Sequence, residues 1–557
     1  MRKKMKVKTQ IMRTNVPFFT AFAALPAMLI SGEHTTSAEN FSGTAGKPNI
    51  LFCIADDASF HHFSNSGCRW VSTPNFDRIA DEGISFRRCY TPNAKSAPSR
   101  AIVLTGRYSW QLKEAGNHVC NFPADIKVFT EVLSGAGYDV AYTGKGWGPG
   151  NPGVVDGKPR KLTGEPYQKE KCEPPTKAIN KCDYAGNFKD FLDDNAGRRP
   201  WFFWFGSHEP HRKYVYGSGI SSGDRSIDDI DEVPSFWADN ETTRTDMLDY
   251  GYEIEYFDSQ IGKMLDELER RGMLSNTVVI VTSDNGMPFP RCKANNYEYS
   301  THMPFAMMWL DGIKKPGRDV SSYVSFIDIA PTVLDLAGID GESEGMCEIS
   351  GRSLRCFIED NVPEEELERR REIILGRERD DYGRPANQGY PIRAIMSDNM
   401  MLIWNLKPWL MPAGNPETGY MDVDGSPTKT AILDMYRNNS GFYLWNLSFG
   451  PRPEYELYDI EKDPYCMNNL AEESSMQDIV RTLSLKLEKC LASQGDPRMV
   501  GDGDVFDRYP FDKADKWNFY ERVMSGELEE PWNSTGWVTP SDYEIYKDNR
   551  NEGHERN

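Results

Sequence analysis

The 557-residue sequence lacks a surplus of positive charge. Lysine and arginine total 64 against 84 aspartates and glutamates, so the formal net charge at pH 7 is −20. A field of that sign repels nucleic acid and gives no general attraction for polyanions. We therefore expect no nucleic-acid partner. Any anionic substrate must be bound by a local cationic pocket or by a metal ion.

Long apolar runs are also scarce. One run, from Val16 to Ile30, follows a basic segment and precedes the small residues Thr36-Ser37-Ala38. This arrangement is typical of a signal peptide. A membrane anchor is the alternative, but the run is shorter than the ~20 residues that a spanning helix needs. We expect export to a bacterial periplasm or to the medium, and a mature chain that does not span a membrane.

The eleven cysteines lack the spacing of a metal site, and the sequence has no internal repeats. The first absence argues against a cysteine-ligated zinc domain, and the second against a solenoid or propeller. Because the number is odd, at least one thiol per chain is unpaired. Cys172 and Cys182 are a candidate disulfide, whereas Cys53 fits a buried strand.

What is present is a regular alternation of buried strands and amphipathic helices. Continuous apolar runs occupy residues 49–55, 140–143, 201–205 and 277–282. Helical patterns lie between them at residues 73–82, 125–136 and 245–271. This alternation predicts an α/β fold in which helices cover both faces of a sheet.

From about residue 377 the pattern changes to short strands, at 393–395 and 400–404, and a helix at 475–492. It predicts a smaller α+β domain with a short antiparallel sheet. We divide the chain into a signal peptide (1–38), a linker (39–47), a catalytic domain (48–376), a C-terminal α+β subdomain (377–541) and a polar tail (542–557).

Two acidic pairs follow predicted strands. Asp56-Asp57 ends the first strand, and Asp284-Asn285 ends the strand at 277–282. Ligands of α/β sheets gather at the carboxyl ends of strands. Four hard oxygen donors there suit Ca²⁺ or Mg²⁺ better than zinc or copper. Either pair alone fits a helix cap or a solvated turn equally well.

The string SAPSRAIVLTGR, at residues 96–107, reads as a helix start. Pro98 suits the first turn, which puts Ser96 at the helix N-terminus, where an anion binds well. On these grounds alone, a serine cap beside a salt-bridging arginine is the better explanation.

The same string resembles the signature of type I sulfatases in the alkaline phosphatase superfamily, CxPSRxxxLTGR, with serine in place of cysteine. The likeness continues through SFIDIAPTVLDLAG (325–338) and ELYDIEKDPYCMNNLA (456–471). It implies a large alkaline-phosphatase-like mixed sheet sandwiched by helices. It also implies oxidation of Ser96 to formylglycine (3-oxoalanine). A serine implies an anaerobic sulfatase-maturating enzyme as a transient partner, unless it replaces a cysteine by design.

The resemblance also implies roles for individual residues. The implied calcium ligands are Asp56, Asp57, Asp284, Asn285 and the formylglycine at Ser96. The implied catalytic residues are Arg100, which steadies the aldehyde hydrate, Lys145, which binds sulfate, and His208, which protonates the leaving group.

One position departs from the family pattern. Trp147 stands where the family has a histidine that assists the expulsion of sulfate. The base for that step is therefore unassigned, and His211 is a candidate replacement. Trp147 is itself a candidate for stacking on a sugar.

The strings DNGMPFPRCKANNY (284–297) and FFWFGSHEPHR (202–212) resemble the heparan N-sulfatase (sulfamidase) branch. In that branch a basic residue at the position of Lys293 contacts the sulfate. The implied substrate is a sulfated glycosaminoglycan-type saccharide such as N-sulfoglucosamine. Because the chain is negatively charged and lacks a basic stripe, we expect attack at the ends of oligosaccharides. Three alternatives remain open: an O-sulfatase acting on another glycan, a phosphatase or phosphonate hydrolase with an unmodified serine, and an inactive glycan-binding relative.

A further charged string, Arg377-Glu378-Arg379, lies at the predicted domain junction. Its arginines could grip a sugar by bidentate contacts. A solvated cluster of charges between domains explains the string equally well.

Overall fold

The computed structural model describes residues 47–155, 157–195, 197–528 and 537–544. The predicted signal peptide, the linker before Lys47 and the tail beyond Glu544 lie outside these residues. Within the described part of the chain, no helix combines the length and the apolar character that crossing a bilayer requires.

The larger sheet is mixed. Its strands lie in the order β11 (His302–Met303), β2 (Ile84–Tyr90), β12 (Phe305–Met308), β10 (Thr277–Ser283), β1 (Asn49–Ala55), β9 (Trp201–Gly206), β4 (Asp139–Gly144) and β8 (Glu165–Pro166), and β13 (Arg318–Ser325) also pairs with β2. The central strand β1 is parallel to both β9 and β10, whereas β12 is antiparallel to β10. All four predicted apolar strands are present, as β1, β4, β9 and β10.

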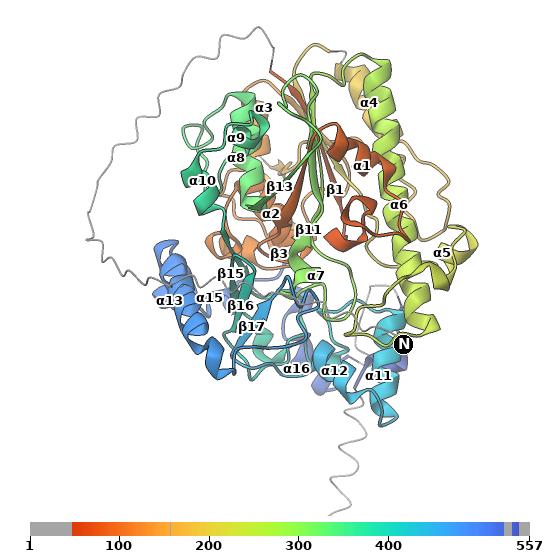
Figure 1. The fold of residues 1–557 in the computed structure, drawn as a ribbon, viewed down its shortest axis with the longest axis vertical. Coiled ribbons are helices and arrows are strands. Elements are labelled where there is room, and N and C mark those ends of the chain that lie inside the picture. The colour runs from red at the N-terminus through yellow and green to blue at the C-terminus, as the bar shows by residue number, and fades with distance from the viewer. Residues whose placement is uncertain (1–46, 156, 196, 529–536, 545–557) are drawn as a thin grey trace, which may run out of the picture. The chain divides into compact units, whose positions relative to one another are not determined.

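Helices cover both faces of this sheet (Figure 1). Alternate side chains of β1 enter two separate apolar cores, with Phe52 in one and Cys53 in the other. The first core includes α2 (Ser96–Thr105), α3 (Phe129–Gly135) and α8 (Ile329–Ala337), and the second includes α1 (Pro74–Asp81), α4 (Tyr184–Asn195) and α6 (Glu241–Arg270). The predicted α/β sandwich is therefore confirmed. Helix α3 begins four residues later than expected, because Glu131 accepts a hydrogen bond from the Val128 amide and so caps the helix there.

The second sheet is antiparallel, as predicted. It consists of β14 (Glu372–Arg377), β15 (Ile392–Ser397), β16 (Met400–Asn405) and β17 (Tyr455–Asp459). Helix α13 (Gln477–Ser493) packs against it through Leu483, Leu487 and Leu491. Further helices of this part are α11 (Pro427–Arg437), α12 (Phe442–Phe449) and α16 (Phe519–Met524). The domain boundary at residue 377 remains a prediction.

The candidate disulfide is absent: Cys172 and Cys182 are both free thiols. The Cys182 thiol faces Thr143, with Sγ 3.5 Å from the threonine hydroxyl oxygen. The Cys172 thiol instead faces the hydroxyl of Tyr256, at 3.9 Å. The two side chains therefore point to different partners, and the prediction of a bridge was wrong.

A buried ion-pair network joins the small sheet to the N-terminus of α14 (Pro497–Val500). Arg393 of β15 is fully buried and donates from Nε to Asp496 Oδ2 at 2.7 Å and from Nη2 to Glu378 Oε1 at 2.5 Å. Removing the arginine leaves the buried carboxylate of Asp496 without its side-chain cation, while Glu378 keeps its pair with Arg498. We expect Arg393→Leu to lower the free energy of unfolding by ~3–5 kcal/mol in chemical denaturation.

The matched control is Arg371→Leu, which breaks an exposed ion pair with Asp398. Because solvent screens such pairs, its denaturation midpoint should stay at the wild-type value. Equal effects of the two substitutions would contradict the assigned role of the buried network.

Candidate active site

The two acidic pairs lie side by side at the ends of adjacent strands. In the parallel pairing of β1 with β10, Ala55 is opposite Ser283, so the next residues of both strands leave the sheet at the same edge. Carboxylate oxygens of Asp56, Asp57 and Asp284 lie within 4.8 Å of one another. The expectation that these strand ends meet is confirmed.

Hydrogen bonds fix this acidic cluster. The backbone amide of Asp57, at φ 76°, donates to Asp284 Oδ1 at 3.0 Å. Asn285 Nδ2 donates to Asp57 Oδ1 at 2.7 Å. The Oδ1 atom of Asn285 is buried and has no hydrogen-bond partner in the described part of the chain. A buried acceptor without a partner is costly, and together with three carboxylates it forms a donor set that fits Ca²⁺.

Three cations compensate the buried acids. Lys145 Nζ lies 2.6 Å from Asp56 Oδ1, Lys293 Nζ 2.6 Å from Asp57 Oδ2, and Arg100 Nε 2.8 Å from Asp284 Oδ2. Burial would raise the pKa of Asp56, but Lys145 and further cations outweigh it and hold the pKa well below its usual range. Burial raises the pKa of Asp284 despite Arg100. Asp56 is therefore the more strongly ionised of these two carboxylates.

Ser96 is the first residue of α2, as predicted from Pro98. Its side-chain Oγ lies 3.2 Å from Asp56 Oδ1 and 3.1 Å from Lys145 Nζ. Arg100, one turn later, also donates to the carbonyls of Lys145 and Gly146, both at 3.1 Å. The hydroxyl thus lies at a helix N-terminus between an anion and a cation, an arrangement that suits binding of an anionic group.

These residues border a cavity of about 670 Å³. The predicted site residues that line it are Asp56, Ser96, Lys145, His208, His211 and Lys293. Burial lowers the pKa of His208 to about 4. The imidazole is therefore neutral at pH 7 until a bound anion raises its pKa.

Four predicted substrate-binding residues do not line the cavity. The indole of Trp147 donates to the Ala97 carbonyl at 3.0 Å and stacks edge-on against Phe122. The other three side chains are nearly or fully buried and contact protein groups. Arg377 pairs with Asp380 and Asp422, and Glu378 pairs with Arg393 and Arg498. The guanidinium group of Arg379 lies over the ring of Phe511. The structure thus gives Arg377, Glu378 and Arg379 protein partners in place of a sugar.

Other cavity residues were not identified from the sequence. Lys95 Nζ lies 2.7 Å from Asp381 Oδ2, and His118 Nδ1 lies 3.3 Å from the other carboxylate oxygen of Asp381. Asp424 Oδ2 lies 2.9 Å from Lys293 Nζ. Lys95 adjoins Ser96 in the sequence and could have been inferred from that position. Asp381 belongs to the charged string that begins at Arg377, for which a sugar contact was one interpretation, whereas Asp424 carries no local signal.

Comparisons with known proteins agree with this geometry. The family profile described as Sulfatase matches residues 48–339. Human N-sulphoglucosamine sulphohydrolase is 28% identical over 492 residues, covering 82% of this chain and 93% of that protein. N-acetylglucosamine-6-O-sulfatase of Bacteroides thetaiotaomicron is 26% identical over 408 residues, covering 56% and 71%.

The chain is also similar to a solved structure of a protein in complex with its substrate, D-glucosamine-2-N,6-O-disulfate. The TM-score is 0.56 and the sequence identity is 20%, and the match covers 81% of this chain and 99% of that one. This likeness shows the shared fold. The profile itself covers more than half of the chain, including both acidic pairs and Ser96. The chain therefore belongs to the sulfatase family, whose members are hydrolases of sulfuric esters.

Proposed function

We propose that the protein removes sulfate from glucosamine-containing, glycosaminoglycan-type saccharides, using a formylglycine made from Ser96 and a calcium ion. The observation that carries the proposal is the convergence of Ser96 Oγ with Asp56 and Lys145, at 3.2 and 3.1 Å, in one cavity. The names of the relatives, an N-sulphoglucosamine sulphohydrolase and an N-acetylglucosamine-6-O-sulfatase, support the substrate class. The proposal also includes a maturating enzyme that oxidises Ser96, and export of the protein to a bacterial periplasm or to the medium.

Asp56, Asp57, Asp284 and Asn285 would hold the calcium ion. When bound, the metal supplies positive charge that stabilises anionic oxygens of the sulfuryl group. Formylglycine supplies a hydrated aldehyde as nucleophile, with a second hydroxyl that allows sulfate to leave. This chemistry explains why an unmodified serine would stall as a sulfate ester.

The cations of the cavity bind the sulfate. Lys145 and Lys293 border the cavity, and each is paired with a carboxylate of the acidic cluster. A calcium ion bound among those carboxylates would compete with the two ammonium groups for the same negative charge and so weaken these pairings. The ammonium groups of Lys145 and Lys293 would then be available to contact the substrate. Arg100, held by Asp284 and two carbonyls, orients the start of α2.

His208 would donate the proton to the leaving group. It is neutral in the substrate-free site, and the anionic sulfuryl group favours its protonation. We expect His208→Ala to lower kcat by ~10²–10⁴ for N-sulfoglucosamine, whose amine needs a proton to leave. Steady-state assays should show a much smaller loss for an aryl sulfate with an acidic phenol, because that phenolate leaves unprotonated. Equal losses on both substrates would rule out the acid role.

A substrate panel tests the proposed function. Matured protein would be assayed for sulfate release from N-sulfoglucosamine, glucosamine 6-sulfate and galactosamine 6-sulfate, and for phosphate release from the matching phosphate ester. We expect the highest kcat/KM on a sulfated glucosamine. Preference for galactosamine would keep a sulfatase mechanism but overturn the substrate class. Phosphate release by unmatured protein would favour a serine phosphatase, and binding without turnover a glycan-binding relative.

A further inference from the structure

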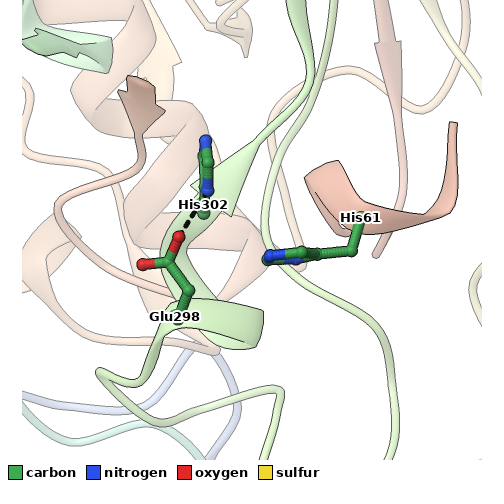
Figure 2. Close-up of side chains that lie close together, drawn as sticks. All are labelled: His61, Glu298 and His302. Carbon is green, nitrogen blue, oxygen red and sulfur yellow. Dashed lines mark hydrogen bonds and ion pairs between the residues drawn. The ribbon is translucent and has the colours of Figure 1, made fainter. Parts of the chain in front are cut away.

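A second cluster of metal-binding side chains lies outside the cavity (Figure 2). It consists of His61 in the 3-10 helix Phe60–His62, Glu298 at the start of α7 (Glu298–Thr301), and His302 at the start of β11. One potential ligand atom of each residue lies within 4.8 Å of the others. The set therefore has the spacing needed to share one ion after small side-chain shifts.

His302 has the hydrogen-bonding pattern of a histidine ligand. Its Nε2 lies 2.9 Å from the carbonyl oxygen of Arg87 and must donate to it. The neutral ring then has a lone pair on Nδ1, which lies 2.5 Å from Glu298 Oε1. The Nδ1 atom and the carboxylate oxygen would repel each other at that distance unless a proton lay between them. A bound metal ion would take the place of that proton. Ligating histidines commonly donate their second nitrogen to a backbone carbonyl in this way.

Aromatic packing fixes the ring of His302. Phe60 stacks on it with centroids 4.0 Å apart, and Tyr90 also stacks on it, at 4.5 Å. The hydroxyl of Tyr90 lies 3.1 Å from both carboxylate oxygens of Glu298. Both side chains are thus held in place by neighbours that are not ligands, as in preorganised metal sites.

His61 supplies an atom that the protein leaves unsatisfied. Its Nδ1 is buried and has no hydrogen-bond partner among the residues that the structure describes, while its ring stacks on Tyr299 at 4.1 Å. Figure 2 shows the nitrogen-bearing end of this ring directed toward Glu298 and His302.

We propose that His61, Glu298 and His302 bind a zinc ion, separate from the calcium site. Two imidazoles and one carboxylate form a ligand set typical of Zn²⁺, with a fourth position left for water. The all-oxygen cluster at Asp56, Asp57 and Asp284 instead suits a hard cation. The chemistry of the donors therefore assigns different metals to the two clusters.

The zinc ion would join the two segments that carry the calcium ligands. His61 follows Asp57 by four residues, and Glu298 follows Asn285 in the segment after β10. Ser59 already links these segments, because its hydroxyl donates to the Tyr299 carbonyl at 2.7 Å and accepts from the Met287 amide at 2.9 Å. We infer a structural role, in which zinc holds the strand-end loops in register.

Metal titration of the full-length protein tests this site. The protein would be stripped with a chelator, saturated with Ca²⁺ and titrated with Zn²⁺, with bound metal measured by mass spectrometry. Co²⁺ would be used in parallel for its visible spectrum. We expect one zinc per chain with calcium present, and at least ~100-fold weaker binding for His61→Phe, which keeps the aromatic stack but removes a ligand.

Two controls separate this site from the active site. His118→Gln removes a histidine of the cavity, and Asn285→Ala removes a proposed calcium ligand; both should retain one zinc. No zinc bound by the calcium-saturated wild type would overturn the proposal, whatever the fold of the variants. Loss of zinc in Asn285→Ala with retention in His61→Phe would also overturn it, because the ion would then occupy the calcium site.

Discussion

Replacing Ser96 by alanine is expected to lower sulfate release by at least ~10⁴-fold, because it removes the hydroxyl from which the proposed formylglycine nucleophile would be made. Ser96 Oγ contacts Asp56 and Lys145, but its removal leaves the pair between those two residues intact at 2.6 Å. The fold should therefore survive. Thermal unfolding would be measured alongside the sulfate assay. Equal unfolding midpoints for the variant and the wild type would show that the activity is lost through catalysis and not through unfolding.

The matched substitution is Ser96→Cys. In a host whose maturating enzyme accepts cysteine, this variant should regain activity in proportion to the formylglycine it contains. In a host without such an enzyme, it should be as inactive as Ser96→Ala. Activity of Ser96→Ala within tenfold of the wild type would exclude residue 96 as the nucleophile.

Replacing Asp57 by asparagine is expected to weaken calcium binding by ~100-fold or more, because the affinity of oxygen sites depends on the number of charged ligands. Asp57 is fully buried, accepts from Asn285 and pairs with Lys293. Loss of its charge removes an anionic ligand while leaving the shape nearly unchanged. Calorimetric titration should show weaker binding, and high calcium should restore part of the activity.

Asp424→Asn is the control for this change. Asp424 also pairs with Lys293, at 2.9 Å, but does not belong to the Asp56, Asp57 and Asp284 cluster. Its substitution should change calcium affinity by less than tenfold. Asp57, His211 and Asp424 form an alternative group with metal-ligand spacing. If Asp424→Asn weakened binding as much as Asp57→Asn, the ion would belong to that group.

Much of the site could be predicted because its signals are local. Buried parallel strands appear as continuous apolar runs, so Asp56 and Asp284 could be assigned to strand ends before their adjacency was known. Pro98 marks the start of α2 and so defines the position of Ser96.

Contacts made by the C-terminal part could not be predicted. Arg377 is the last residue of β14 and Arg379 follows the strand, so their local sequence does not distinguish them from surface residues. Their partners Asp422 and Phe511 lie far along the chain. The sequence left a sugar contact and a solvated charge cluster equally open, whereas the structure shows both side chains buried against these protein partners. Asp424 could not be identified for the same reason, because its place in the site depends on its contact with Lys293, which is distant in the sequence.

The fold of the C-terminal part was predictable only in outline. Its short strands were expected at 393–395 and 400–404, and they are longer in the structure, as β15 and β16. Pairing extends a strand beyond its apolar residues, because backbone hydrogen bonds do not depend on side-chain polarity. The proposed zinc ligands His61 and His302 gave no signal, since they lie 241 positions apart in the sequence.

The most direct test of the account is the chemical state of residue 96 compared with activity. Protein produced with and without an anaerobic maturating enzyme would be digested, and the peptide containing residue 96 weighed. Formylglycine makes this peptide ~2 Da lighter than serine does. We predict that sulfate release from N-sulfoglucosamine rises in proportion to the converted fraction and is absent from unconverted protein. Equal activity of converted and unconverted protein, or no activity after full conversion, would contradict the account.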